Sequence, residues 1–151
     1  MSEHRVSIEW SRNNGPFARG NYSPDHEILA GGQTLRASSA PDYGGNAAHA
    51  DPEQLLASSL SSCHMLTFLA LCANRAYVID TYTDDAVALL GKNAEGKNAV
   101  VQVTLAPKVR FSGDKRPTGE EFVKLHERAH GACFIANSVR TAVDVQAEIL
   151  P

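Results

Sequence analysis

This sequence of 151 residues lacks an even set of cysteines, a long apolar run and the features of a signal peptide. The three cysteines are an odd number, which does not fit the paired framework of a small secreted disulfide protein. The longest apolar stretch, Met65 to Ala73, is too short to span a bilayer. The opening segment MSEHRVSIEW alternates polar and apolar residues and has no hydrophobic core of a signal peptide. We therefore expect a cytoplasmic protein with no membrane partner.

An excess of positive charge is also absent. The chain carries 14 Lys and Arg against 17 Asp and Glu, which gives a formal net charge of −3. The basic residues are scattered, so the charge pattern does not indicate nucleic acid as a partner. No linker or repeat interrupts the chain, and its length suits one hydrophobic core. We predict a single domain over residues 1–151.

The hydrophobic pattern predicts three strands, a long helix, two strands, a second helix and a last strand. A hairpin turn is expected at Gly31–Gly32, between two of the first three strands. This order indicates the α+β class with mostly antiparallel sheets. The predicted strands cover residues 6–10, 26–30, 33–38, 77–90, 98–111 and 143–149.

Both predicted helices have clear starts. Asp51 is a suitable N-cap for the long helix, Pro52 is favoured at its first position, and the pattern continues to about Ala76. Its second half is apolar on nearly all sides, so we expect a second subunit to cover part of it. The second helix begins with the capping box Thr118–Glu121 and is expected to end at Gly131.

Helix geometry limits which cysteines can act together. Cys63 and Cys72 are nine residues apart, so they point to opposite sides of the helix and lie about 13 Å apart along it. This separation excludes a disulfide, and Cys72 is interpreted as a packing residue. Cys63 and Cys133 are either a redox pair or two more core residues. The neighbouring histidines, His64 and His130, favour a reactive pair.

Two segments of the chain resemble the OsmC/Ohr family of thiol peroxidases. The segment DPEQLLASSLSSCHMLTFLA, residues 51–70, is similar to the family's central-helix signature. The segment AHGACFIANSV, residues 129–139, is similar to the segment that carries the family's second cysteine. The resemblance implies the OsmC-like fold in an intertwined homodimer. It also implies reduction of organic hydroperoxides, and sometimes hydrogen peroxide, without a bound cofactor or metal, followed by re-reduction by a dithiol such as a lipoyl protein.

The resemblance also assigns roles to individual residues. Cys63 matches the peroxidatic cysteine that reacts with the hydroperoxide, and Cys133 matches the resolving cysteine. Glu53 matches the family's glutamate. The family's arginine lies in the N-terminal strand-and-loop region, where Arg19 in the segment FARGNY is our first choice. The alternatives are Arg12 and Arg36.

The chemistry explains why an arginine is needed. The thiolate is the nucleophile, and a free cysteine is only a few per cent thiolate at pH 7. A guanidinium stays charged and can hold both the thiolate and a peroxide oxygen. Glu53 is ten residues, or about 15 Å, from Cys63 along one helix, so we expect it to act through the arginine or from the other subunit. The apolar residues Leu60, Met65, Leu66 and Phe68 would favour alkyl hydroperoxides.

Two other hypotheses stay open. A protein with this fold could lack peroxidase activity and bind a small molecule in the dimer cleft. Less favoured is a zinc site, in which His126, His130 and Cys133 form an H-x3-H-x2-C pattern that Cys63 and His64 could complete. No catalytic role is assigned to His64.

Overall fold

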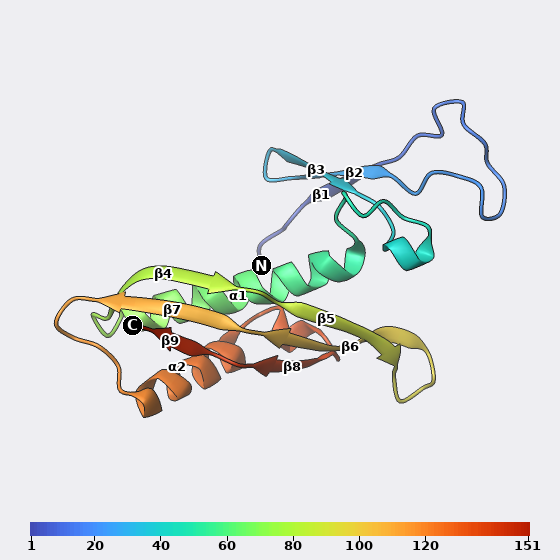
Figure 1. Cartoon of the computed structure of the whole chain (residues 1–151). Coiled ribbons are helices and arrows are strands. Elements are labelled where there is room, and N and C mark those ends of the chain that lie inside the picture. The colour runs from blue at the N-terminus through green and yellow to red at the C-terminus, as the bar shows by residue number, and fades with distance from the viewer. The chain divides into compact units, whose positions relative to one another are not determined.

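The computed structural model describes all residues from 1 to 151, and the chain forms two compact units, residues 1–55 and 56–151 (Figure 1). The long helix α1 (Pro52–Ala73) begins at the end of the first unit and belongs almost entirely to the second. The single domain expected over residues 1–151 stays a prediction.

The N-terminal unit contains an antiparallel sheet of three strands, β1 (Val6–Glu9), β2 (His26–Ala30) and β3 (Gln33–Ala37). The turn between β2 and β3 is confirmed at Gly31 and Gly32, whose φ angles of +56° and +76° suit a two-residue hairpin. A short 3-10 helix, η1 (Pro41–Tyr43), follows the sheet. The strand β1 is exposed along its whole length.

The C-terminal unit contains two sheets of three strands each. One has the order β4-β7-β9 and the other β5-β6-β8. The pairs β4–β7 and β5–β6 are antiparallel, whereas β8 and β9 pair in parallel with β6 and β7. The strands are β4 (Val78–Asp84), β5 (Val87–Lys92), β6 (Asn98–Leu105), β7 (Pro107–Ser112), β8 (Ala142–Val145) and β9 (Glu148–Leu150). The predicted α+β class with mostly antiparallel pairing is confirmed.

Each strand segment predicted after α1 is interrupted, so three predicted strands appear as six. The break between β6 and β7 has a clear cause. The backbone N–H of Ala106 donates to the Asp84 carboxylate at 2.7 Å and not to a neighbouring strand. Pro107 has no N–H to donate. The ladder is therefore interrupted at this point, and β6 and β7 belong to different sheets.

The helix α1 begins as predicted and ends earlier. The Asp51 carboxylate accepts from the Gln54 N–H at 2.7 Å, and the Gln54 side chain accepts from the Asp51 N–H at 3.1 Å, which forms a capping box. The helix stops at Ala73, three residues before the predicted end. There Ala76 has a left-handed φ of 57°, and the Tyr77 N–H bonds back to the Cys72 carbonyl, which is a Schellman end.

The second helix, α2 (Gly119–Ala132), confirms its predicted start. Thr118 accepts from the Glu121 N–H at 3.2 Å, and the Glu121 carboxylate accepts from the Thr118 N–H at 2.8 Å. The helix passes through Gly131 and ends one residue later than predicted. A 3-10 turn, η2 (Ala136–Ser138), follows it.

The helix α1 packs into two hydrophobic cores of the C-terminal unit. Its first half joins Ala57 and Leu60 to Val103 and Leu105 of β6. Its second half lies against both α2 and β7, in a cluster formed by Phe68, Cys72, Tyr77, Val109, Phe111, Phe122, Leu125 and Ala129. The two helices therefore meet along the second half of α1, next to Cys63.

By length and composition alone, α1 could cross a membrane, with a mean hydropathy of 1.6. The apolar run from Met65 to Ala73 is part of this longer helix. A core helix passes the same test, and five residues of α1 are buried within the protein: Ala57, Leu60, His64, Phe68 and Cys72. These residues lie in the two hydrophobic cores described above.

The cap of α2 gives a first test of the structure. Replacing Thr118 with alanine should lower the free energy of unfolding by about 1 kcal/mol, because the Glu121 N–H loses its partner. Glu120→Ala is the control, since Glu120 lies in the same exposed turn and takes no part in the cap, and it should change stability by less than about 0.5 kcal/mol. Urea unfolding measures both. Equal effects of the two substitutions would contradict the cap.

Candidate active site

The structure brings together the two cysteines that lie seventy residues apart in the sequence. Cys63 is a partly exposed residue of α1, and Cys133 is the C-terminal cap of α2, where it is 1% exposed. The Cys63 side chain acts directly on the pKa of the Cys133 thiol, so the two side chains are neighbours. No disulfide joins them. Two neighbouring thiols on separate elements can form a disulfide.

The surroundings of Cys133 favour its protonated form. Burial raises the pKa of the Cys133 thiol, and the hydrogen bond to Cys63 raises it further. The backbone N–H groups of Ala136 and Ile135 act in the opposite direction, and the first of them lies 3.4 Å from the Cys133 sulfur. Cys133 therefore stays a thiol at neutral pH.

Cys72 is separated from this pair. It is fully buried in the core between α1, α2 and β7, as predicted for a packing residue. Burial raises the pKa of the Cys72 thiol to about 11. A thiol with this pKa is almost entirely protonated at pH 7 and is a poor nucleophile.

A buried histidine pair lies beside the two thiols. The Nε2 atom of His64 and the Nδ1 atom of His126 are hydrogen-bonded at 2.9 Å, and the two residues are 1% and 4% exposed. Phe68 stacks on the His126 ring with 4.0 Å between centroids, and Phe122 meets it edge-on at 4.5 Å. The pair therefore joins α1 to α2 one residue away from Cys63.

No catalytic role was predicted for His64, because its partner is 62 residues away and no local pattern connects them. Burial lowers the pKa of His64 to about 4, and the charge of His130 contributes in the same direction. Burial also lowers the pKa of His126 to about 3, with a contribution from His64. Both rings are thus neutral at neutral pH.

The backbone around Cys63 is held by two hydroxyl groups. Ser61 donates to the Asp84 carboxylate, which ties α1 to the junction between β4 and β5. Thr67 donates to the Cys63 carbonyl at 2.9 Å. The Asp84 carboxylate also binds Ala106, so one side chain connects the helix to the break in the sheet.

The apolar residues expected to surround a substrate differ in their exposure. Leu60 and Phe68 are fully buried in the two cores, and the expected preference for alkyl hydroperoxides stays a prediction. Leu66 is exposed. Phe134 directly follows Cys133 in the sequence and is 83% exposed. It is the largest apolar residue adjacent in sequence to either Cys63 or Cys133.

The three candidate arginines belong to the N-terminal unit. Arg19 is an exposed turn residue between Ala18 and Asn21, and its side chain makes no hydrogen bond or ion pair. Arg12 donates to the Gly15 carbonyl of its own loop at 2.9 Å. Glu53, in the first turn of α1, forms no ion pair with any of these arginines, Arg36 included. The roles proposed for Arg19 and Glu53 stay predictions.

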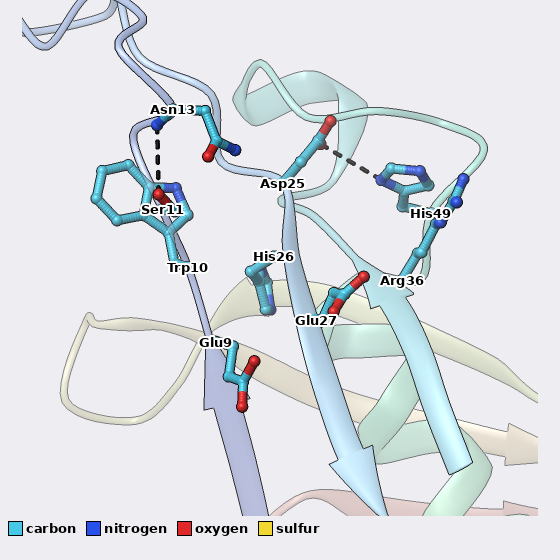
Figure 2. A pocket seen from close by; sticks show the side chains of 9 residues that line it. All are labelled: Glu9, Trp10, Ser11, Asn13, Asp25, His26, Glu27, Arg36 and His49. Carbon is cyan, nitrogen blue, oxygen red and sulfur yellow. Dashed lines mark hydrogen bonds and ion pairs between the residues drawn. The ribbon is translucent and has the colours of Figure 1, made fainter.

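Arg36 lines a pocket with a volume of about 570 Å³ (Figure 2). On β3 it pairs with Glu27 of β2, which in turn pairs with Glu9 of β1. The pocket is also lined by Trp10, Ser11, Asn13, Asp25, His26 and His49. Sequence reasoning did not find this cluster, because its members come from three strands and two loops.

Asp25 holds one side of this pocket together. It accepts from the Ser38 hydroxyl at 2.8 Å and lies 3.4 Å from the Nδ1 atom of His49 (Figure 2). The Ser38 hydrogen bond lowers the pKa of Asp25, and the charge of His49 lowers it further. These contacts fasten the loop after β3 to the start of β2.

The whole chain lacks a conventional protein metal site. No group of three or more His, Cys, Asp or Glu side chains is arranged to hold one ion. The zinc site considered from the sequence, in which Cys63 and His64 could complete the set His126, His130 and Cys133, therefore has no such group in the structure.

Comparison with known proteins identifies relatives of this chain. The model of the OsmC-like protein family matches residues 44–148. An OsmC-like protein of unknown function, VCA0330 from Vibrio cholerae, is 42% identical, and its structure matches with a TM-score of 0.92, covering 99% of this chain and 100% of that one. No curated protein sequence matches.

Two more distant structures share the fold. An organic hydroperoxide resistance protein from Elizabethkingia anophelis is 18% identical with a TM-score of 0.71, covering 99% of this chain and 96% of that one. The organic hydroperoxide resistance protein OhrB of Bacillus subtilis is 20% identical with a TM-score of 0.65, covering 99% and 98%. At these identities the similarity shows the fold alone.

The buried histidine pair makes stability sensitive to acid. Above pH 6.5 both rings are neutral in the folded and unfolded chains. Below that value the unfolded chain binds protons that the folded pair, with pKa values of about 4 and 3, does not bind. The free energy of unfolding should therefore fall by up to about 1.4 kcal/mol per pH unit for each histidine, down to about pH 4. Urea unfolding in a buffer with a chelator measures this slope.

The double variant His64→Leu/His126→Phe is the control for this test. It replaces both partners with apolar side chains, so no polar atom of the pair is left unsatisfied. All other titrating groups are common to the two proteins. The variant should lose the part of the slope that belongs to the pair, and an unchanged slope would contradict the assignment.

Proposed function

The chain belongs to the OsmC-like protein family, and from this we propose that it is a thiol-dependent peroxidase that reduces organic hydroperoxides. The observation that carries the proposal is that the Cys63 and Cys133 side chains are neighbours, although the residues are seventy positions apart. Further support comes from the relatives of Elizabethkingia anophelis and Bacillus subtilis, which are named as organic hydroperoxide resistance proteins.

The different exposure of the two thiols supports their different roles. Cys63 is partly exposed and can meet a substrate, whereas Cys133 is buried and has a raised pKa. In the proposed first step, the Cys63 thiolate attacks one oxygen of the hydroperoxide and the O–O bond breaks. The other oxygen leaves with the electron pair and takes up a proton to give the alcohol. Cys63 becomes a sulfenic acid, oxidised by two electrons.

Cys133 then resolves the sulfenic acid. Its sulfur attacks the sulfur of Cys63, the S–S bond forms and the S–O bond breaks, and the hydroxide takes the Cys133 proton to leave as water. The N–H groups of Ile135 and Ala136 point at the Cys133 sulfur and stabilise negative charge on it as the proton departs. A dithiol, such as a lipoyl group, then returns two electrons and two protons to the pair.

The proposed thiolate at Cys63 needs a cation. Arg19 is our first choice, and its lack of any ion pair leaves its five donors available. Arg36 is the main alternative, because it lines a pocket and lies opposite Glu27. Glu53 is proposed to orient the arginine by a bidentate pair.

A homodimer is also part of the proposal. Val6 and Ile8 of β1 are each 60% exposed, and Phe134 next to Cys133 is more exposed still. Exposed apolar side chains of this kind are typical of surfaces that a partner covers. A second copy of the chain is the partner that the family resemblance implies.

Peroxidase kinetics test the proposal. Reduced protein should consume cumene hydroperoxide faster than hydrogen peroxide in a stopped-flow assay, and Cys63→Ser should abolish the reaction because the nucleophile is lost. Cys133→Ser should still react once and then retain a sulfenic acid that dimedone traps. A wild-type protein no faster than Cys63→Ser would rule the proposal out.

Matched variants complete this assay. Cys72→Ser removes a thiol of similar burial that takes no part in the proposed chemistry, so the rate should stay within about twofold when measured well below its unfolding temperature. Arg19→Ala should lower kcat/KM by about a hundredfold, as loss of a charged donor at a reacting atom does. If Arg36→Ala shows this loss and Arg19→Ala does not, Arg36 is the arginine.

A further inference from the structure

The connection between β1 and β2 is a long exposed loop that carries three aromatic residues. It spans residues 10–24 and extends beyond the ends of both strands (Figure 1). We call it the aromatic loop. Trp10, Phe17 and Tyr22 are 44%, 67% and 51% exposed. Single exposed apolar side chains are normal, whereas a contiguous patch of them marks a surface that binds something.

The three rings form one patch because they contact one another. The ring centroids of Trp10 and Phe17 are 5.8 Å apart, and those of Phe17 and Tyr22 are 5.6 Å apart. The Trp10 indole N–H donates to the Ser23 carbonyl at 2.8 Å, which fastens one end of the loop to the other. Together with Ile8, Pro24 and His26, the rings line a pocket of about 580 Å³. The patch is therefore contiguous and faces solvent.

A tight turn in the aromatic loop places an arginine beside the rings. Ala18 and Asn21 exchange two backbone hydrogen bonds, of 3.1 and 2.9 Å, which close a two-residue turn. Gly20 in this turn has a left-handed φ of 71°, which glycine adopts without strain. Arg19 is the other turn residue, and it is exposed. Phe17 directly precedes the turn, so a cation and an aromatic ring are presented together.

The aromatic loop is positively charged in an otherwise acidic chain. Residues 10–24 contain Arg12 and Arg19 and no Asp or Glu, which gives a formal charge of +2, whereas the whole chain carries −3. The nearest carboxylates in the sequence, Glu9 and Asp25, lie at the base of the loop, and Asp25 already pairs with His49. An anionic surface therefore attracts this loop and repels the acidic remainder of the chain.

We propose that the aromatic loop binds the surface of an anionic lipid bilayer. Trp and Tyr are enriched where a bilayer meets water, because each has an apolar ring and a polar N–H or O–H. Interfacial segments combine such rings with basic residues, whose charges are attracted to anionic headgroups. Here Phe17, the most exposed of the three rings, enters between the headgroups, and Arg12 and Arg19 contact the phosphates. A surface contact needs no membrane-spanning segment, the feature on which the expectation of no membrane partner was based.

The test uses the single tryptophan of the chain, because Trp10 lies in the patch. The full chain is titrated with vesicles of phosphatidylcholine and phosphatidylglycerol in equal parts, and separately with vesicles of phosphatidylcholine alone. With the mixed vesicles, Trp10 emission should move to shorter wavelength and quenching by acrylamide should fall. The neutral vesicles should change neither signal. Cosedimentation with the vesicles measures the affinity.

Matched variants separate the aromatic loop from other exposed groups. Arg19→Gln should weaken binding to the mixed vesicles about fivefold, as the loss of one arginine near an anionic surface does. Arg128→Gln makes the same change of charge at an exposed position of α2 and should leave the affinity unchanged. Tyr22→Ser should weaken binding several-fold because apolar area is lost. Tyr43→Ser removes a more exposed tyrosine of the same unit and should have no effect.

Three results would overturn the proposal. The first is protein that neither sediments with the mixed vesicles nor changes its Trp10 emission, and the second is equal binding to neutral vesicles. The third is Trp10 that acrylamide does not reach before lipid is added, because a second copy of the chain or another protein then covers the patch. Arg12 and Arg19 are also candidates for the proposed Cys63 thiolate, so every readout here is binding. The outcome is therefore independent of the peroxidase proposal.

Discussion

The hydrogen bond between His64 and His126 is the contact on which the candidate active site depends. Cys63 lies on α1 and Cys133 lies at the end of α2, so the thiols meet only if the two helices pack in one register. Apolar contacts have no preferred direction and would tolerate a shift of one helix along the other. A buried hydrogen bond is directional, and breaking it leaves two polar atoms unpaired in a low-dielectric core. This bond, inside the aromatic cluster of Phe68 and Phe122, therefore fixes the register.

Burial then gives the three cysteines different chemistry. Cys72 lies in the same core and stays a protonated packing residue. Cys133 is equally hidden, but it faces Cys63 and two backbone N–H groups, so it is suited to donate a proton first and attack later. Cys63 is the one of the three with an exposed surface. The different roles of the three cysteines in the proposed peroxidase thus follow from their positions on the two helices.

Local chemistry made much of the fold predictable from the sequence. The caps at Asp51 and Thr118 and the hairpin at Gly31–Gly32 depend on residues three or fewer positions apart, and each was predicted correctly. The end of α1 was placed too late, because Ala76 adopts a left-handed φ that its residue type does not predict. The strand breaks were missed because the bond from Ala106 to Asp84 spans 22 residues.

Only part of the candidate site was predictable, because the sequence shows local patterns and not tertiary contacts. The meeting of Cys63 and Cys133 was expected from a family resemblance, whereas the histidine pair and the pocket around Arg36 depend on tertiary contacts that no local pattern encodes.

The central claim is that Cys63 and Cys133 of one chain form a disulfide when they meet a hydroperoxide. The most direct measurement is peptide mass spectrometry after reduced protein has been treated with one equivalent of cumene hydroperoxide and alkylated. The account predicts a Cys63–Cys133 disulfide within each chain, with Cys72 recovered as a free thiol. A disulfide that includes Cys72, or two cysteines that both remain reduced while the hydroperoxide is consumed, would contradict it.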